Sequence, residues 1–179
     1  MVVGEAATSQ DKTEKKMMTF ILKANDDTEV TVPEDVAFQS NLIKKMVQDL
    51  GITDSDSEML KEALPVSNLD GWTLHKIVEW CTIHRAEVYK PKEEHEDPRI
   101  TLTKEDEDYM NVTSDQLLAM LLGANYLDIP GIIDIITQKI ANMAIGKSVE
   151  EIREIYGLVN DFTPEEEEEL RKRFEWVEA

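Results

Sequence analysis

Apolar side chains alternate with polar ones near the start of the chain. This alternation runs through residues 18–22 and again through 30–32, and polar turn residues at 25–27 separate the two runs. A period of two is typical of half-buried strands, so the pattern predicts a β-hairpin. Residues 63–66 are expected to add a third short strand, at a sheet edge because Pro65 has no amide donor.

Further along the chain the apolar spacing becomes helical. It predicts a helix at 41–50 that ends at Gly51, and another near 72–85. Later helix starts carry a Ser or Thr followed three positions on by Gln or Glu, which is the capping-box pattern. These pairs are Thr113 with Gln116, Ser148 with Glu151, and Thr163 with Glu166. The helix after Thr113 and the next one, which Pro130 opens, are so apolar that we expect both to be largely buried.

Two segments lack apolar periodicity. Residues 1–16 are small, polar and charged, and we expect a disordered tail there. Residues 86–111 are dense in Glu, Asp and Lys, and we interpret them as an acidic, flexible loop inside a domain. The predicted organisation is a mixed α/β domain over 17–146 that contains this loop, followed by C-terminal helices over 147–179.

Charge narrows the classes of partner. The 179 residues include 38 acidic and 19 basic side chains, for a formal net charge of −19. Nucleic acids and anionic membranes are recognised through clustered Lys and Arg, so this balance disfavours both. Proteins with electropositive contact surfaces are the expected partners. No apolar run is long enough to span a bilayer and no apolar signal core is visible, so we expect a cytoplasmic and nuclear protein.

Few residues offer catalytic chemistry. Cys81 is the single cysteine, and His84 lies three positions later on the same predicted helix, with His75 earlier on it. These residues allow part of a metal site or a Cys–His nucleophile pair, but a packed cysteine beside a surface histidine is favoured. Isolated glycines provide no phosphate-binding loop. We therefore predict no catalytic residues, no cofactor and no metal, in a protein that is not an enzyme.

The C-terminal helices carry apolar side chains with no evident place in a core. Leu170 and Phe174 lie on one stripe of the last helix, and Trp176 lies beside it. Isolated helices shorter than about 12–15 residues are marginal in water, so these helices need a surface to pack on. That surface belongs either to this chain's own domain or to a partner, and the pattern leaves both open.

Short segments throughout the chain share their residues and their order with one family. They comprise residues 50–51, 78–84, 124–131, 140–147, 150–153 and 160–169. Together they resemble the Skp family, the adaptor subunits of SCF (Skp–cullin–F-box) ubiquitin ligases, over roughly residues 18–177. The resemblance implies an α/β fold of the BTB/POZ type, a small sheet with flanking helices, followed by a C-terminal helical extension.

The resemblance also implies partners and contact residues. The BTB part would contact the N-terminal helices of a cullin through Asn125 and Tyr126, with Leu121 as a weaker candidate. The extension would hold the F-box of a substrate receptor. The implied F-box contacts are Ile152, Ile155, Tyr156, Asn160, Asp161, Phe162 and Trp176. Helix C-capping at Asn125 and Tyr126, and core packing at Ile152 and Phe162, are the alternatives. A homodimer is expected when no F-box protein is bound.

Two departures from the family pattern indicate a divergent paralogue. Glu105 stands where the family usually has a Trp before the Asp, and the C-terminus reads Glu-Trp-Val-Glu-Ala rather than Gln-Trp-Cys followed by acidic residues. Three alternatives to an SCF adaptor remain. They are an Elongin-C-like adaptor, which lacks the long C-terminal extension, a BTB assembly protein independent of ubiquitin, and an enzyme that uses Cys81.

Overall fold

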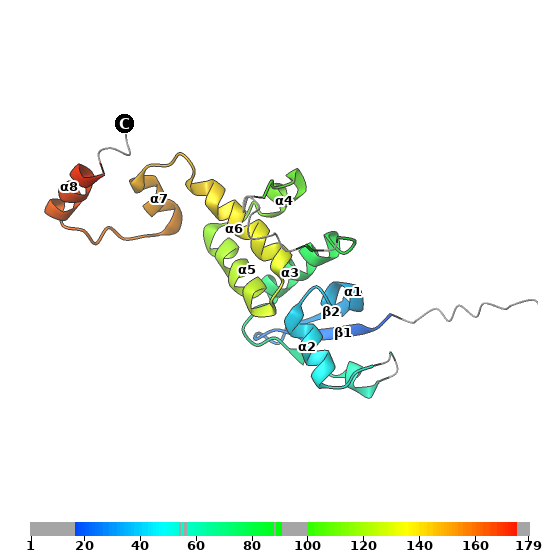
Figure 1. Ribbon diagram of the computed structural model, residues 1–179. Coiled ribbons are helices and arrows are strands. Elements are labelled where there is room, and N and C mark those ends of the chain that lie inside the picture. The colour runs from blue at the N-terminus through cyan, green and yellow to red at the C-terminus, as the bar shows by residue number, and fades with distance from the viewer. Residues whose placement is uncertain (1–16, 54, 56, 88, 91–99, 175–179) are drawn as a thin grey trace, which may run out of the picture. The chain divides into compact units, whose positions relative to one another are not determined.

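The computed structural model describes residues 17–53, 55, 57–87, 89–90 and 100–174. The chain divides into two compact units: residues up to 96 with 119–133, and residues 97–118 with 134–179. Its elements in chain order (Figure 1) are β1 (Thr19–Lys23), β2 (Glu29–Pro33), α1 (Glu34–Ala37), α2 (Asn41–Asp49), the 3₁₀ turn η1 (Glu58–Lys61), β3 (Leu64–Pro65), α3 (Gly71–Ile83), α4 (Lys104–Tyr109), α5 (Ser114–Leu127), α6 (Pro130–Ala144), α7 (Val149–Tyr156) and α8 (Pro164–Arg173).

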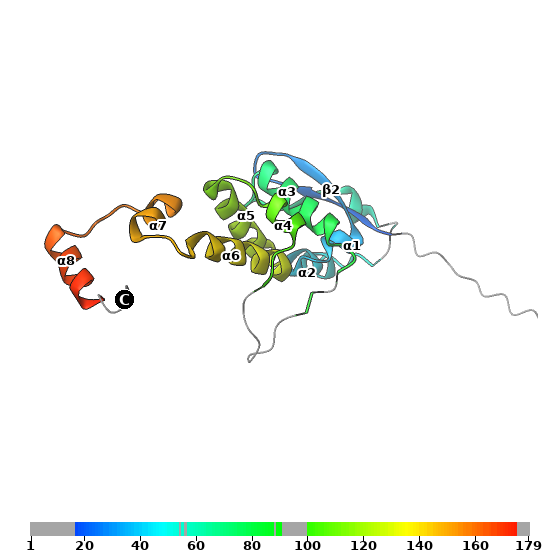
Figure 2. The ribbon, with the colours of Figure 1, turned by 90° about the horizontal axis from the view of Figure 1, so that it is seen from above.

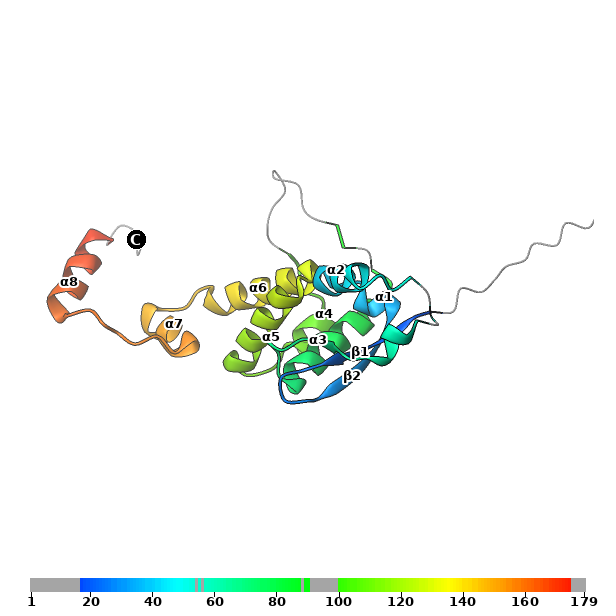
Figure 3. The same cartoon turned by 90° about the horizontal axis from the view of Figure 1, so that it is seen from below.

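A three-stranded sheet in the order β2-β1-β3 lies in the first unit. Strands β1 and β2 form the predicted antiparallel hairpin, in which Phe20 pairs with Val32 and Leu22 with Val30 (Figure 3). All four side chains are buried, so the alternating pattern identified the core face of the sheet correctly. Strand β3 lies at an edge, as predicted, and pairs with β1 in parallel.

The hairpin turn also anchors the start of α3. The Asp26 carboxylate accepts hydrogen bonds from the backbone N–H of Thr28 at 3.1 Å and of Gly71 at 2.9 Å. The bond from Gly71 contributes most to holding the pKa of Asp26 below its ordinary value of 3.8. Asp70 then caps α3 by accepting from the Thr73 N–H at 2.8 Å. A turn residue and a cap residue therefore fix the same helix end.

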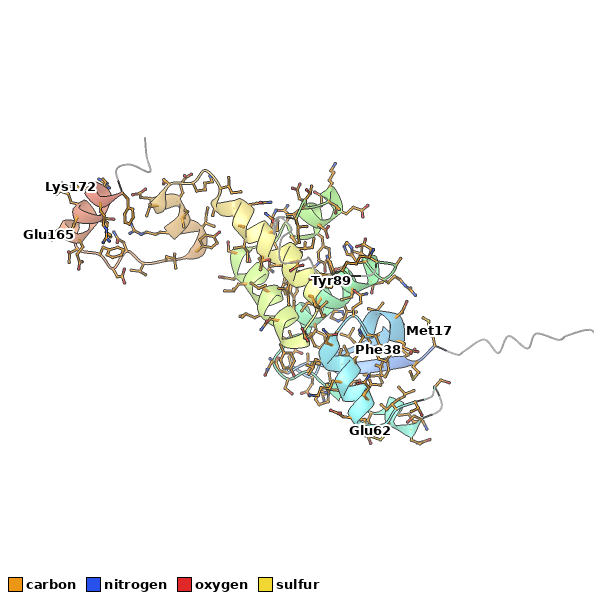
Figure 4. All side chains as sticks on the ribbon, in the orientation of Figure 1. Met17, Phe38, Glu62, Tyr89, Glu165 and Lys172 are labelled. Atoms are coloured by element: carbon orange, nitrogen blue, oxygen red, sulfur yellow. The ribbon has the colours of Figure 1, made fainter. Side chains whose placement is uncertain are left out.

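Helices cover the sheet in the first unit. Helices α1 and α3 contact β2 and each other (Figure 2). Phe38, which follows α1, packs its ring 5.7 Å from that of Phe20 on β1 (Figure 4). The predicted helix near 72–85 is confirmed as α3, and its apolar residues Leu74, Ile77 and Cys81 are buried.

Helix α2 and the end of α5 are joined by Ser40. Its hydroxyl accepts from the Ile43 N–H at 3.1 Å to cap α2, and it donates to the Leu127 carbonyl. Gly123 in α5 lies against α3 so closely that a Cβ placed there would be 2.8 Å from Ile77 Cδ1. The lack of a side chain at Gly123 thus permits this packing.

Residues 104–109, within the expected flexible loop, form α4 in the second unit, and for these residues the expectation is wrong. Thr103 caps the helix by accepting from the Asp106 N–H at 3.1 Å, and Met110 after it is buried. A polar helix of this length with one buried apolar neighbour produces no visible periodicity. Residues 88 and 91–99 of the predicted loop lie outside the described residues.

The C-terminal helices of the second unit begin where their capping boxes predicted. Ser148 caps α7 with Glu151, and Thr163 caps α8 with Glu166, with Pro164 in the first turn. Gly157 ends α7 in the left-handed conformation at φ 63°. Thr113 and Gln116 form the expected reciprocal bonds before α5, at 3.1 and 3.3 Å. In the part of the chain that the structure describes, no helix has both the length and the apolar character needed to cross a membrane.

Candidate partner-binding surfaces

One face of α5 is apolar and exposed. Leu122 has 62% of its surface exposed, and Leu118, one turn earlier on the same helix, has 50%. The prediction that α5 is largely buried is therefore wrong for these two residues. The spacing of Leu118, Leu121, Leu122 and Asn125 places them along one side of the helix. Asn125 is exposed and Leu121 is half-buried, so predicted cullin contacts lie beside the exposed leucines.

The C-terminal end of α5 is fixed by backbone bonds. Asp128 adopts a left-handed conformation at φ 53°, its N–H donates to the Asn125 carbonyl at 3.1 Å, and the Ile129 N–H donates to the Ala124 carbonyl at 3.1 Å. This is a Schellman-type end. Asn125 thus takes part in capping through its backbone carbonyl, and the residue is exposed. Because capping uses only the backbone, it is compatible with a contact role for the Asn125 side chain. The neighbouring Tyr126 is half-buried.

A second apolar surface lies in the C-terminal helices and the segment between them, residues 157–163. No residue of α7 or α8 is buried. The segment is more exposed still, with Val159 exposed over 86% of its surface. The large apolar residues exposed in this region are Val149, Leu158, Val159, Phe162 and Phe174. Each of these residues is therefore exposed over about half of its surface or more.

The predicted F-box contacts fall into two groups. Asn160, Asp161 and Phe162 are exposed in the segment that joins α7 to α8. Ile152, Ile155 and Tyr156 lie on α7 and are half-buried. Tyr156 is engaged inside the unit, since its hydroxyl donates to the Ile140 carbonyl of α6 at 2.7 Å. Trp176 lies outside the described residues, as does the predicted tail 1–16.

Some exposed residues of this surface were missed by sequence reasoning. Val149, Leu158 and Val159 are each more exposed than the predicted contact Phe162. Leu158 and Val159 follow the helix-ending Gly157, where helical periodicity no longer applies. The sequence did offer one signal for their exposure, because Leu158 and Val159 are adjacent apolar residues between the helix-ending Gly157 and the helix cap Thr163.

Both C-terminal helices carry carboxylates that their caps hold ionised. The hydrogen bond from the Ser148 backbone N–H is the main cause that holds the pKa of Glu151 below its ordinary value of 4.5, and the bond from the Lys147 side chain is the second cause. The backbone N–H and then the hydroxyl of Thr163 have the same effect on the pKa of Glu166. The exposed apolar surface therefore lies beside stable negative charges at neutral pH.

The Cys81 alternative lacks suitable chemistry. Burial raises the pKa of the Cys81 thiol to about 12, so the nucleophilic thiolate is scarce at neutral pH. His84 stacks on Trp80 with ring centroids 4.2 Å apart, and its Nδ1 lies 3.0 Å from the Glu87 carboxylate. Among the described residues no group of three or more His, Cys, Asp or Glu side chains is placed to hold a metal ion.

Two family models match this chain. Residues 18–86 match the Skp1 family tetramerisation domain, and residues 130–177 match the Skp1 family dimerisation domain. The chain belongs to the Skp1 family. The fold agrees with this membership, since the three-stranded sheet and its flanking helices lie within the region of the POZ-type match. The predicted family and fold class are thereby confirmed.

Curated relatives of this Skp1-family chain match nearly its whole length. A protein of Neosartorya fischeri and one of Aspergillus fumigatus are each 40% identical over 164 residues, which cover 90% of this chain and 99% of the relative. A protein of Talaromyces marneffei is 39% identical over 159 residues, which cover 88% of this chain and 95% of the relative. All three are named E3 ubiquitin ligase complex SCF subunit sconC.

Proposed function

We propose that this Skp1-family chain is the adaptor that bridges a cullin scaffold to F-box substrate receptors in an SCF-type E3 ubiquitin ligase. The observation that carries the proposal is the exposed apolar surface of α7, α8 and residues 157–163, in a family whose named relatives are SCF subunits. A monomer seldom leaves such side chains together in water unless a partner covers them. An F-box is the partner that the family implies.

The cullin side is assigned to α5. The proposed contacts are Asn125, Tyr126 and Leu121, together with the exposed Leu118 and Leu122. Leucines exposed over half their surface or more can each bury further area against a helical partner at little cost to the free chain. Charge supports a protein partner as well, because the net charge of −19 opposes binding to nucleic acid and to anionic membranes.

The receptor side is assigned to the C-terminal helices. The proposed contacts are Ile152, Ile155, Tyr156, Asn160, Asp161, Phe162 and Trp176, with Leu158 and Val159 added from the structure. The role is that of a scaffold without chemistry of its own, and ubiquitin transfer takes place on other subunits. Holding both partners at once raises the effective concentration of substrate near the catalytic arm. The proposed location is the cytoplasm and the nucleus, and the proposed state without a receptor is a homodimer.

The cullin assignment is tested with the double substitution Asn125→Lys and Tyr126→Lys in the full chain. The lysines should weaken binding to a cullin N-terminal domain, because they place charge on the proposed contact, while capture of an F-box domain continues. Calorimetric titration against each partner separates the two effects. Normal cullin affinity in the double variant would count against this surface.

The receptor assignment is tested by removing residues 148–179. The shortened chain should lose F-box capture and keep cullin binding, because α5 lies outside the deletion. Full F-box capture by the shortened chain would reject the assignment. A chain that loses both partners would contradict the proposal of two separate surfaces.

A further inference from the structure

The carboxylate of Glu167 joins three parts of the C-terminal region. Its Oε1 lies 3.1 Å from Arg153 Nη1 on α7 and accepts a hydrogen bond from Asn160 Nδ2 at 3.0 Å. Glu167 itself lies in α8, between Glu165 near the start of the helix and Lys172 near its end (Figure 4). One oxygen atom thus connects α7, the segment 157–163 and α8.

This contact differs from a typical surface ion pair. The side chain of Arg153 is 18% exposed and that of Glu167 is 36% exposed, and the two residues are 14 positions apart. The nearby pair of Lys172 and Glu168 is 73% and 69% exposed and joins adjacent turns of one helix. A partly desolvated, charge-assisted contact between two helices constrains their arrangement, whereas an exposed pair within one helix does not.

Asn160 carries the constraint into the apolar segment. Its Nδ2 donates to Glu167, and its Oδ1 accepts from the Phe162 N–H at 3.2 Å. The start of the segment is held from the other side, since the Leu158 N–H donates to the Arg153 carbonyl at 2.8 Å. The backbone near each end of the segment 157–163 is therefore hydrogen-bonded to Arg153 or Asn160, the two residues that contact Glu167.

We propose that Glu167, through Arg153 and Asn160, positions the apolar segment 157–163 for its receptor before the receptor arrives. The inference rests on the proposed function and deepens it. Glu167 is a positioning residue, and the apolar side chains of the segment make the contact with the F-box. Asn160, a proposed contact, also has a role inside the chain, because both polar groups of its side chain bond to Glu167 and to the Phe162 backbone.

Preorganisation sets the expected size of the effect. When only a fraction of the molecules has the binding-competent arrangement, the apparent dissociation constant is the intrinsic constant divided by that fraction. If removing the Glu167 carboxylate leaves about a fifth of the molecules competent, the dissociation constant for an F-box domain rises about fivefold. The apolar contacts themselves are unchanged by this substitution.

The test combines a distance measurement with a binding measurement on the full chain. Spin labels on Cys residues substituted at the exposed Glu154 of α7 and Glu169 of α8, with Cys81→Ala, report the helix arrangement through electron–electron double resonance. Calorimetry with a recombinant F-box domain from the same genome reports affinity. The variants are Glu167→Ala, the matched control Glu168→Ala, and the charge exchange Arg153→Glu with Glu167→Arg.

The expected result is a narrow distance distribution in the parent chain and a broad one in Glu167→Ala, with about fivefold weaker F-box binding. Glu168→Ala should leave both unchanged. The charge exchange should narrow the distribution again, because it restores the ion pair between α7 and α8. Arginine at position 167 cannot accept from Asn160 Nδ2, so affinity should recover only in part, to within about threefold of the parent. This rescue would not occur if Glu167 only contributed general stability or negative charge.

Two outcomes would overturn the inference. A distribution that stays narrow in Glu167→Ala would show that the contact does not set the arrangement, and a broad distribution with unchanged affinity would show that the arrangement does not matter for binding. Failure of the proposed function looks different, because the parent chain itself would then not bind the F-box domain.

Discussion

Replacing Leu122 with Lys separates binding from folding on α5. About three fifths of the Leu122 surface stays in water in the free chain. Full burial of a leucine contributes about 1.5–3 kcal/mol, so covering the exposed part with a partner is worth about 1–2 kcal/mol. Loss of that contribution raises the dissociation constant for a cullin by roughly five- to thirtyfold. An exposed substitution changes the free energy of unfolding by only about 0.5 kcal/mol.

The assay pairs titration calorimetry against a cullin N-terminal domain with urea unfolding of the free chain. Ile83→Lys is the matched control, because Ile83 is a similarly exposed apolar residue, at 51%, on α3. The control should leave cullin affinity within a factor of two of the parent value. If Leu122→Lys binds the cullin as tightly as the parent, or if Ile83→Lys weakens it equally, α5 is not the contact surface. Unfolding of the chain by Leu122→Lys would show that Leu122 supports the fold and is not a free contact residue.

Three further predictions address the rest of the molecule. Val159→Asp should reduce F-box affinity at least tenfold in calorimetry and leave cullin affinity unchanged, since Val159 is exposed and its loss affects only the receptor surface. Because the caps lower the pKa values of Glu151 and Glu166, their stabilisation is complete above the ordinary value of 4.5 and is lost as the pH falls through the lower folded values. Circular dichroism should therefore show constant helicity from pH 7 to about 5 and a decline below about 4.5. Gly123→Ala should lower the free energy of unfolding in urea, because overpacking costs about 1–3 kcal/mol and outweighs the helix preference for Ala of about 1 kcal/mol.

Local patterns predicted the elements whose causes are local. The hairpin followed from alternation, and the helix starts at Ser148 and Thr163 followed from hydroxyl and carboxylate groups three positions apart. These signals involve neighbours in sequence and do not depend on packing. Helix α4 was missed because its stability depends on one cap and on burial of Met110, which a periodicity search cannot detect.

The candidate surfaces were harder to predict because exposure depends on the whole fold. Apolar spacing marks Leu117, Leu118 and Leu122 alike, yet the structure buries Leu117 and exposes the other two. The contact between Arg153 and Glu167 was also invisible, since it requires the left-handed turn at Gly157 to bring two helices together. The family resemblance supplied contact segments, and the structure added which side chains on them face water.

A bridging adaptor must hold a cullin and an F-box receptor on one chain at the same time. Light scattering on a size-exclusion column, run on an equimolar mixture of the chain, a cullin N-terminal domain and an F-box domain, tests this requirement most directly. A chain that bridges both partners should give a single peak with the mass of one copy of each component. Separate peaks for the two binary complexes, with either partner displacing the other, would contradict it.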